Sequence, residues 1–166
     1  MRFTITDLSA FKADPNLFYA ASYRPTLQAM VDAVIEAEAP IKDDVLAQRV
    51  ARAHGWLRTG ARIREQIEHH LRTLDRTRES TGTFLWKPGT VAARIPFRGP
   101  LNPDHRRSVA DIALAELTDL VLRHPDALEG DDPPLIYARL MQIDRLAATS
   151  RERLVEAITC AKTLSF

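Results

Sequence analysis

Residues 40–64 read PIKDDVLAQRVARAHGWLRTGARIR, and they contain the clearest local signals for how the N-terminal half of the chain folds. The aspartate pair 43–44 can cap a helix that ends at His54-Gly55. Leu46, Val50 and Ala53 have the spacing of residues on one buried face of this helix. After a short turn, Thr59 can cap the next helix. Two helices joined so closely indicate a helix-turn-helix arrangement.

The residues before this pair predict a further helix. The residues after Thr59 continue the apolar spacing of the pair's second helix. The preceding helix begins at Pro25, where a missing N–H costs nothing, and ends before Pro40. Its inward positions are Leu27, Val31, Val34 and Ile35. The helix after Thr59 carries Ile63, Ile67, Leu71 and Leu74 at the same kind of spacing. Residues 1–22 are polar and irregular, so we expect an N-terminal segment without regular structure.

A β-hairpin is expected after the three helices. Residues 83–87, TFLWK, are rich in strand formers, and Pro88-Gly89 fits the centre of a type II turn. The segment Thr90–Ile95 can then return as the partner strand. Three helices followed by a hairpin predict a winged helix-turn-helix unit over residues 23–98.

The remainder of the chain predicts a second helical unit. The cluster GPLNP contains several helix breakers, and residues 99–104 are therefore the expected linker. Residues 105–164 predict three more helices, the first closing near Pro125 and the last capped by Ser150. The expected fold class is mainly α with a small β-hairpin: a winged helix-turn-helix followed by a second three-helix, helix-turn-helix-like unit.

Positive charge is concentrated in the middle of the sequence. The formal net charge of the 166 residues is +1, divided as −2 over residues 1–41, +6 over residues 42–98 and −3 over residues 99–166. Such asymmetry favours a nucleic-acid footprint on one part of the surface. The alternative is an arginine-rich protein in which these side chains are scattered over an ordinary solvated surface.

Several classes of function are disfavoured by the residue types. Cys160 is the single cysteine, which excludes an internal disulfide framework and a cysteine-rich zinc site. His69 and His70 are adjacent and would point about 100° apart on a helix, a poor arrangement for joint metal ligation. No glycine-rich phosphate loop or local nucleophile–base signature occurs. We expect no enzymatic activity, no cofactor and no metal.

The chain has no apolar run of the length that a signal peptide or a membrane span needs. We therefore expect a cytoplasmic protein without a membrane partner. The run HGWLRTG, residues 54–60, is interpreted as a structural turn. In it Gly55 takes a positive φ, Trp56 and Leu57 fill the core, and Gly60 allows close packing.

The sequence resembles a bacterial domain-of-unknown-function family, numbered 3320, over roughly residues 15–160. The segments that carry the resemblance are FYAASYRPTL, EAPIKDDVLAQRVARAHGWLRTGARI, TFLWKPG, IPFRGP, DIALAEL and RLAATSRERLVEAI. One departure is Glu38-Ala39-Pro40, where the family usually has Glu-Gly-Pro. The resemblance implies a place at the C-terminus of large proteins similar to superfamily-1 helicases, often with a nuclease-like domain. It implies an association with DNA metabolism or defence, but it supplies no catalytic residue.

The basic residues of the middle segment are the candidate nucleic-acid contacts. In a winged helix, the start of the third helix enters the major groove, while the wing and the second helix contact phosphates. Arg58, Arg62 and Arg64 would face the groove, and Lys87 and Arg94 would contact phosphates from the wing. Arg49 and Arg52 would do so from the second helix. The expected function is a non-catalytic nucleic-acid-binding module, with DNA favoured, that serves helicase or nuclease domains of the same or a neighbouring polypeptide.

Two alternatives stay open at this stage. Arg62 can pair with Glu65 or Glu68 on an ordinary charged helix face. The chain can also be a protein-interaction or dimerisation scaffold without nucleic-acid contact, in which the basic segment meets an acidic surface or a second copy.

Overall fold

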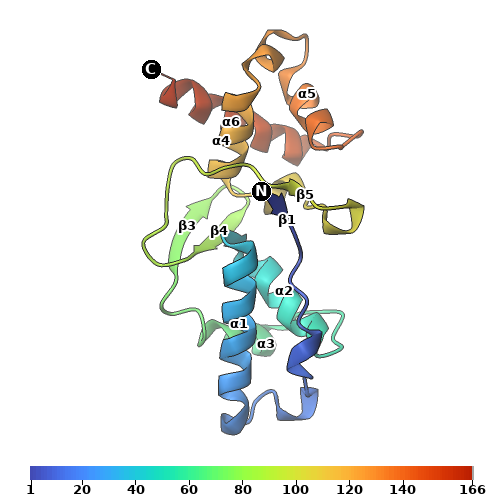
Figure 1. Ribbon diagram of the computed structural model, residues 1–166, viewed down its shortest axis with the longest axis vertical. Helices are drawn as coiled ribbons and strands as arrows, with labels where there is room; N and C mark the ends of the chain where they lie inside the picture. The colour runs from blue at the N-terminus through green and yellow to red at the C-terminus, as the bar shows by residue number, and fades with distance from the viewer. Residues whose placement is uncertain (166) are drawn as a thin grey trace. The chain divides into compact units, whose positions relative to one another are not determined.

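The computed structural model describes residues 1–165 and divides into two compact units, which we treat separately. The N-terminal unit consists of Thr4–Arg78 and Gly82–Val91. The C-terminal unit consists of Met1–Phe3, Glu79–Thr81 and Ala92–Phe166. The described residues are mainly helical with a small antiparallel sheet, as the sequence predicts (Figure 1).

Three α-helices and three strands make up the N-terminal unit. Their order is α1 (Arg24–Glu38), β2 (Ile41–Lys42), α2 (Asp43–Ala53), α3 (Ala61–Glu68), β3 (Asp75–Glu79) and β4 (Gly82–Trp86). The sheet has the order β2-β4-β3, and β2 pairs antiparallel with β4, Ile41 opposite Leu85. Before α1, the segment expected to be irregular contains three 3-10 turns, Ser9–Phe11, Pro15–Leu17 and Ala21–Tyr23.

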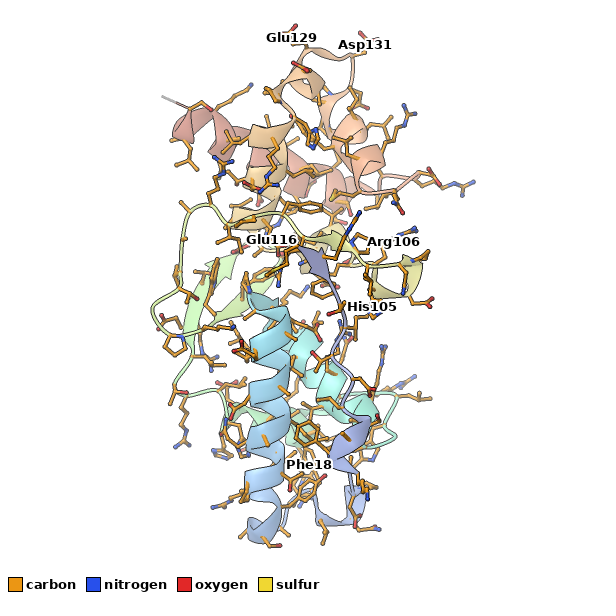
Figure 2. All side chains as sticks on the ribbon, in the orientation of Figure 1. Phe18, His105, Arg106, Glu116, Glu129 and Asp131 are labelled. Atoms are coloured by element: carbon orange, nitrogen blue, oxygen red, sulfur yellow. The ribbon has the colours of Figure 1, made fainter. Side chains whose placement is uncertain are left out.

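The core of this unit follows from the predicted apolar stripes. α1 buries Leu27, Val31, Val34 and Ile35, and α2 buries Leu46 and Val50. Leu85 of the central strand is fully buried, as is Phe18 of the N-terminal segment (Figure 2). Because these side chains come from helices, sheet and N-terminal segment, the core holds all three parts together.

The hairpin differs from the predicted one. The expected strand 83–87 corresponds to β4, but its partner is β3, which precedes it, and the predicted return strand Thr90–Ile95 is wrong. β3 reads DRTRE and has no apolar residue, which is why its strand character was missed. The turn at Pro88-Gly89 does form: Gly89 has a φ of +74°, and the Thr90 N–H donates to the Lys87 carbonyl at 3.1 Å.

The third helix is also shorter than predicted. It ends at Glu68, and Leu71 is buried from the turn that follows. Its N-cap is Gly60, not Thr59. The apolar period continues past Glu68 because the turn after α3 still places Leu71 in the core, so the spacing alone overestimates the length of the helix.

The C-terminal unit contains the three predicted helices and one pair of short strands. These elements are β1 (Arg2–Phe3), β5 (Gly99–Pro100), α4 (Leu114–Arg123), α5 (Pro133–Leu140) and α6 (Ala148–Leu164). β1 and β5 pair in parallel. The expected linker residues thus include a strand, and the 3-10 turn Pro103–His105 follows it. α6 begins at Ala148, so the predicted cap at Ser150 is wrong.

A buried carboxylate joins several segments of this unit. Glu116 on α4 is fully buried and pairs with Arg98 at 2.9 Å and with Arg107 at 2.8 Å (Figure 2). The Arg107 guanidinium also lies over the Phe3 ring, 4.1 Å from its centroid. Burial opposes ionisation, but the hydrogen bonds from Arg107 and Arg98 hold the pKa of Glu116 below its ordinary value. These arginines have a structural role.

Candidate nucleic-acid interface

The candidate interface is the first turn of α3 and the loop before it. Gly60 precedes the helix with an extended backbone, no side chain caps the helix, and no acidic residue lies in its first turn. The first amides of a helix have no intrahelical partners and carry partial positive charge. Arg58 lies just before this turn and Arg62 lies in it, and both are exposed. Together, these features favour an anionic partner.

The loop between α2 and α3 owes its shape to Gly55. This residue has a φ of +84°, and its N–H donates to the Arg52 carbonyl at 2.9 Å. The Trp56 N–H donates to the Ala51 carbonyl at 3.1 Å, which completes a Schellman motif at the end of α2. The prediction of a positive φ at Gly55 is therefore confirmed.

Only one of the two apolar residues after Gly55 packs inward. The Trp56 ring stacks on His54 at 5.3 Å and meets Phe18 edge-on at 4.9 Å. Leu57 is 92% exposed, so its predicted core role is wrong. A side chain added at Gly60 would meet nothing within 4 Å, so close packing does not explain that glycine.

His54 supports the same loop from inside the unit. Its Nδ1 lies 2.7 Å from the Val50 carbonyl, and its Nε2 lies 2.7 Å from the Tyr23 hydroxyl. Since a carbonyl only accepts, Nδ1 carries the hydrogen, and Nε2 accepts from Tyr23. Burial lowers the pKa of His54. This histidine is a neutral structural residue that fixes α2 against the N-terminal segment.

Arg62 and Arg64 remain at the surface with modest contacts. The Arg62 guanidinium lies over the Tyr19 ring, 4.3 Å from its centroid. Arg64 pairs with Asp44 of α2, and both side chains are nearly half exposed. Exposed ion pairs contribute about 0–1 kcal/mol, so a phosphate can replace the Asp44 carboxylate at small cost.

Arg49 and Arg52, both on α2, have different surroundings. Arg49 donates from Nε and Nη2 to Glu38, at 3.2 Å from Oε2 in each case, and Glu38 is fully buried. Thr6 donates to the same carboxylate from its N–H and its hydroxyl, at 2.8 and 2.7 Å. Arg52 is exposed. We therefore keep Arg52 in the candidate interface and assign Arg49 to the structure of the unit.

Lys87 and Arg94, the two predicted wing contacts, belong to different units. Lys87 follows β4 and pairs with Glu36 of α1 at 2.9 Å. Arg94 lies in the C-terminal unit and pairs with Asp119 at 2.7 Å. Asp119 also accepts from the Phe97 N–H at 2.8 Å. Because no strand forms at 90–95, Arg94 has no place on the sheet.

Sequence reasoning missed other basic residues of the N-terminal unit. Arg24 at the start of α1 and Arg72 after α3 are exposed and line one cleft with His69 and His70. Arg76 on β3 pairs with Glu68. For Arg76, the available signal was its spacing from Arg78 in DRTRE, because residues two apart share one face of a strand.

Within residues 1–165, no group of three or more His, Cys, Asp or Glu residues is placed to hold a metal ion. Among the same residues, no helix combines the length and apolar character that crossing a membrane requires.

Fold and surface thus define a mainly helical protein of two compact units, one of which presents exposed arginines around a helix start. Residues 16–65 match the family described as protein of unknown function (DUF3320). The resemblance to that family is confirmed over this segment, which runs from the N-terminal 3-10 turns into α3. No curated protein and no solved structure matches the chain.

Proposed function

We propose that the N-terminal unit is a winged helix-turn-helix domain that binds nucleic acid, with duplex DNA favoured. Its element order supports this: three helices with a tight turn between α2 and α3, then the hairpin β3–β4. The observation that carries the proposal is the exposure of Arg58 and Arg62 on either side of the uncapped start of α3. In this class of domain, the N-terminal residues of that helix contact base edges.

Three further residues supply the phosphate contacts of the proposal. Arg52 is exposed on α2, and Arg64 and Lys87 each carry an exchangeable surface ion pair. Arginine suits both tasks, because its forked donors match phosphate oxygens and the O6/N7 edge of guanine. The exposed Glu65 and Glu68 lie one turn further along α3, so we expect the contact at the first turn.

The chain would act as a non-catalytic accessory module of a helicase- or nuclease-like protein. This part of the proposal rests only on the family resemblance. A module of this kind would hold the duplex while a motor elsewhere in the assembly works on it.

The test measures the affinity of the chain for a labelled DNA duplex by fluorescence anisotropy at several salt concentrations. The triple variant Arg58→Ala, Arg62→Ala, Arg64→Ala should bind at least tenfold more weakly at low salt. Of these three arginines only Arg64 is assigned to a phosphate, so the slope of log K against log salt should become shallower by about 0.9. A single-stranded DNA and an RNA duplex of equal length test the preference for duplex DNA.

The matched control removes three exposed arginines of the C-terminal unit, Arg106, Arg139 and Arg145. It changes the net charge equally, so it should leave binding within about twofold if the interface is local. Absence of binding at low salt, or equal losses in both triple variants, would refute the proposal.

A second function, protein interaction or dimerisation, is favoured by one observation. Leu57 is 92% exposed in the loop between α2 and α3, directly before Arg58. A large apolar side chain in this position suits a protein partner as well as a DNA groove. Light scattering with and without oligonucleotide separates the two. A dimer that is indifferent to DNA and dissociates in Leu57→Ser would support the scaffold.

A further inference from the structure

A cleft of about 400 Å³ in the N-terminal unit is lined by donors and contains no carboxylate. Its walls come from the start of α1, from α3 and from the turn after α3. The lining residues are Arg24, Gln66, His69, His70 and Arg72. The two guanidinium groups create a positive potential that no carboxylate in the lining neutralises, and the two imidazoles add N–H donors.

Arg72 fixes the hydrogen position of His69. The Arg72 Nη2 lies 2.9 Å from the His69 Nδ1. Because arginine is always a donor, this nitrogen accepts, and the hydrogen of neutral His69 is on Nε2. His69 therefore offers an N–H donor without taking up a proton.

A chain of hydrogen bonds orients His70 in the opposite way. The His70 Nδ1 lies 3.0 Å from Gln28 Oε1, and Gln28 Nε2 donates to Asp32 Oδ1 at 2.9 Å. Since the Asp32 carboxylate requires a donor, the Gln28 oxygen must face His70, and Nδ1 carries the hydrogen. The His70 Nε2 is therefore the nitrogen that gains a hydrogen on protonation.

We propose that this cleft binds the phosphate group of a phosphate monoester. A tetrahedral dianion has more acceptor sites than a carboxylate, and the cleft offers forked and single donors from several directions. Its volume lies in the range of small-molecule sites and leaves room for the group esterified to the phosphate. The source is either a small phosphorylated molecule or the phosphorylated end of a nucleic-acid strand, which present the same chemistry.

Anion binding should also draw a proton onto His70. Burial, His69 and Arg24 lower the pKa of His70, and Asp32 raises it by a smaller amount. A bound dianion would favour the imidazolium, so binding takes up a proton. Affinity should therefore increase as the pH falls from 8 to 6.

The first test titrates the whole chain with inorganic phosphate and, separately, with sulfate. NMR of the histidine side chains measures the pKa of His70 in each case. Sulfate keeps its charge over this range, so its pH dependence reports the protein alone. Saturating sulfate should raise the pKa of His70 in the wild-type chain. If that pKa does not change, the proposal is overturned without recourse to any variant.

The second test compares Arg24→Gln and Arg72→Gln with Arg78→Gln, an exposed residue of β3 outside the cleft. Loss of a hydrogen bond from a charged group should weaken anion binding about tenfold to hundredfold in the first two. The Arg78 variant should bind as the wild type does. Equal affinity in all three would refute the site.

The source of the phosphate is decided with 5′-phosphorylated and 5′-hydroxyl oligonucleotides of one sequence. A strand end as ligand predicts tighter binding of the phosphorylated form, lost in Arg24→Gln. Equal binding of both forms, with free phosphate still bound, assigns the cleft to small molecules. The free-anion measurement does not involve duplex binding, so this inference and the proposed function can fail separately.

Discussion

Substitution of Arg49 and of Arg52 should have opposite consequences, although both arginines lie on α2 three residues apart. In Arg49→Ala, the fully buried Glu38 carboxylate loses its ion pair with Arg49 and retains the two hydrogen bonds from Thr6. Removal of one partner of a buried pair typically costs about 3–5 kcal/mol. Because Thr6 still satisfies part of the carboxylate, we expect about 3 kcal/mol. Arg52→Ala removes an exposed side chain, and its cost should stay within about 0.5 kcal/mol.

Urea unfolding followed by tryptophan fluorescence measures this difference. Both tryptophans of the chain, Trp56 and Trp86, lie in the N-terminal unit, so the signal reports that unit. With a slope of about 1.5 kcal/mol per molar urea, Arg49→Ala should lower the midpoint by about 2 M. Arg52→Ala should leave the midpoint almost unchanged and weaken duplex binding, with a salt slope smaller by about 0.9.

Arg49→Lys provides an internal check, because it retains the charge but loses the two-nitrogen contact with Glu38. It should lie between the wild type and Arg49→Ala in stability. If Arg49→Ala folds with an unchanged midpoint and loses duplex binding, the assignment of Arg49 to the structure is refuted. It would then return to the interface beside Arg52.

Two further predictions concern ionisable groups. Glu116→Gln should destabilise the C-terminal unit by about 3 kcal/mol, because Arg98 and Arg107 lose the buried carboxylate charge with which both pair. Thermal unfolding, monitored by circular dichroism, checks this, with the exposed Glu129→Gln as control. An equal effect of both variants would contradict the assigned role of the pair. The N-terminal unit should lose stability as the pH falls from 7.5 to 5.5, since burial lowers the pKa of His54 and His70 and the unfolded chain takes up their protons first. An unchanged or higher urea midpoint at pH 5.5 would contradict this.

Much of the helical framework could be predicted from the sequence because its signals are local. The stripe of α1, the turn at Gly55 and the turn at Pro88-Gly89 depend on residues a few positions apart. β3 was missed because DRTRE becomes a strand only by pairing with β4, which supplies all the apolar residues of the hairpin. Strand propensity depends on such partners more than on the residues themselves.

The sequence could not show in the same way which candidate arginines are exposed enough to contact a nucleic acid. Arg49 and Arg52 look alike in sequence, and the partner that separates them, Glu38, belongs to another helix. Arg94 is close to Lys87 in sequence but lies in the other unit, beside Asp119. Whether an arginine can bind an external anion therefore depends on where the fold places carboxylates.

The fold also distributes the positive charge of the sequence differently from what the segment 42–98 suggests. The +6 segment of the sequence does not fold as one body, and the N-terminal unit has 12 Lys/Arg and 10 Asp/Glu, a net charge of +2. A long-range field is therefore weak, and binding must come from the arrangement of a few exposed arginines. If so, the local triple variant at α3 should matter far more than an equal change of charge in the C-terminal unit. A protein that bound through net charge alone would respond to both in the same way.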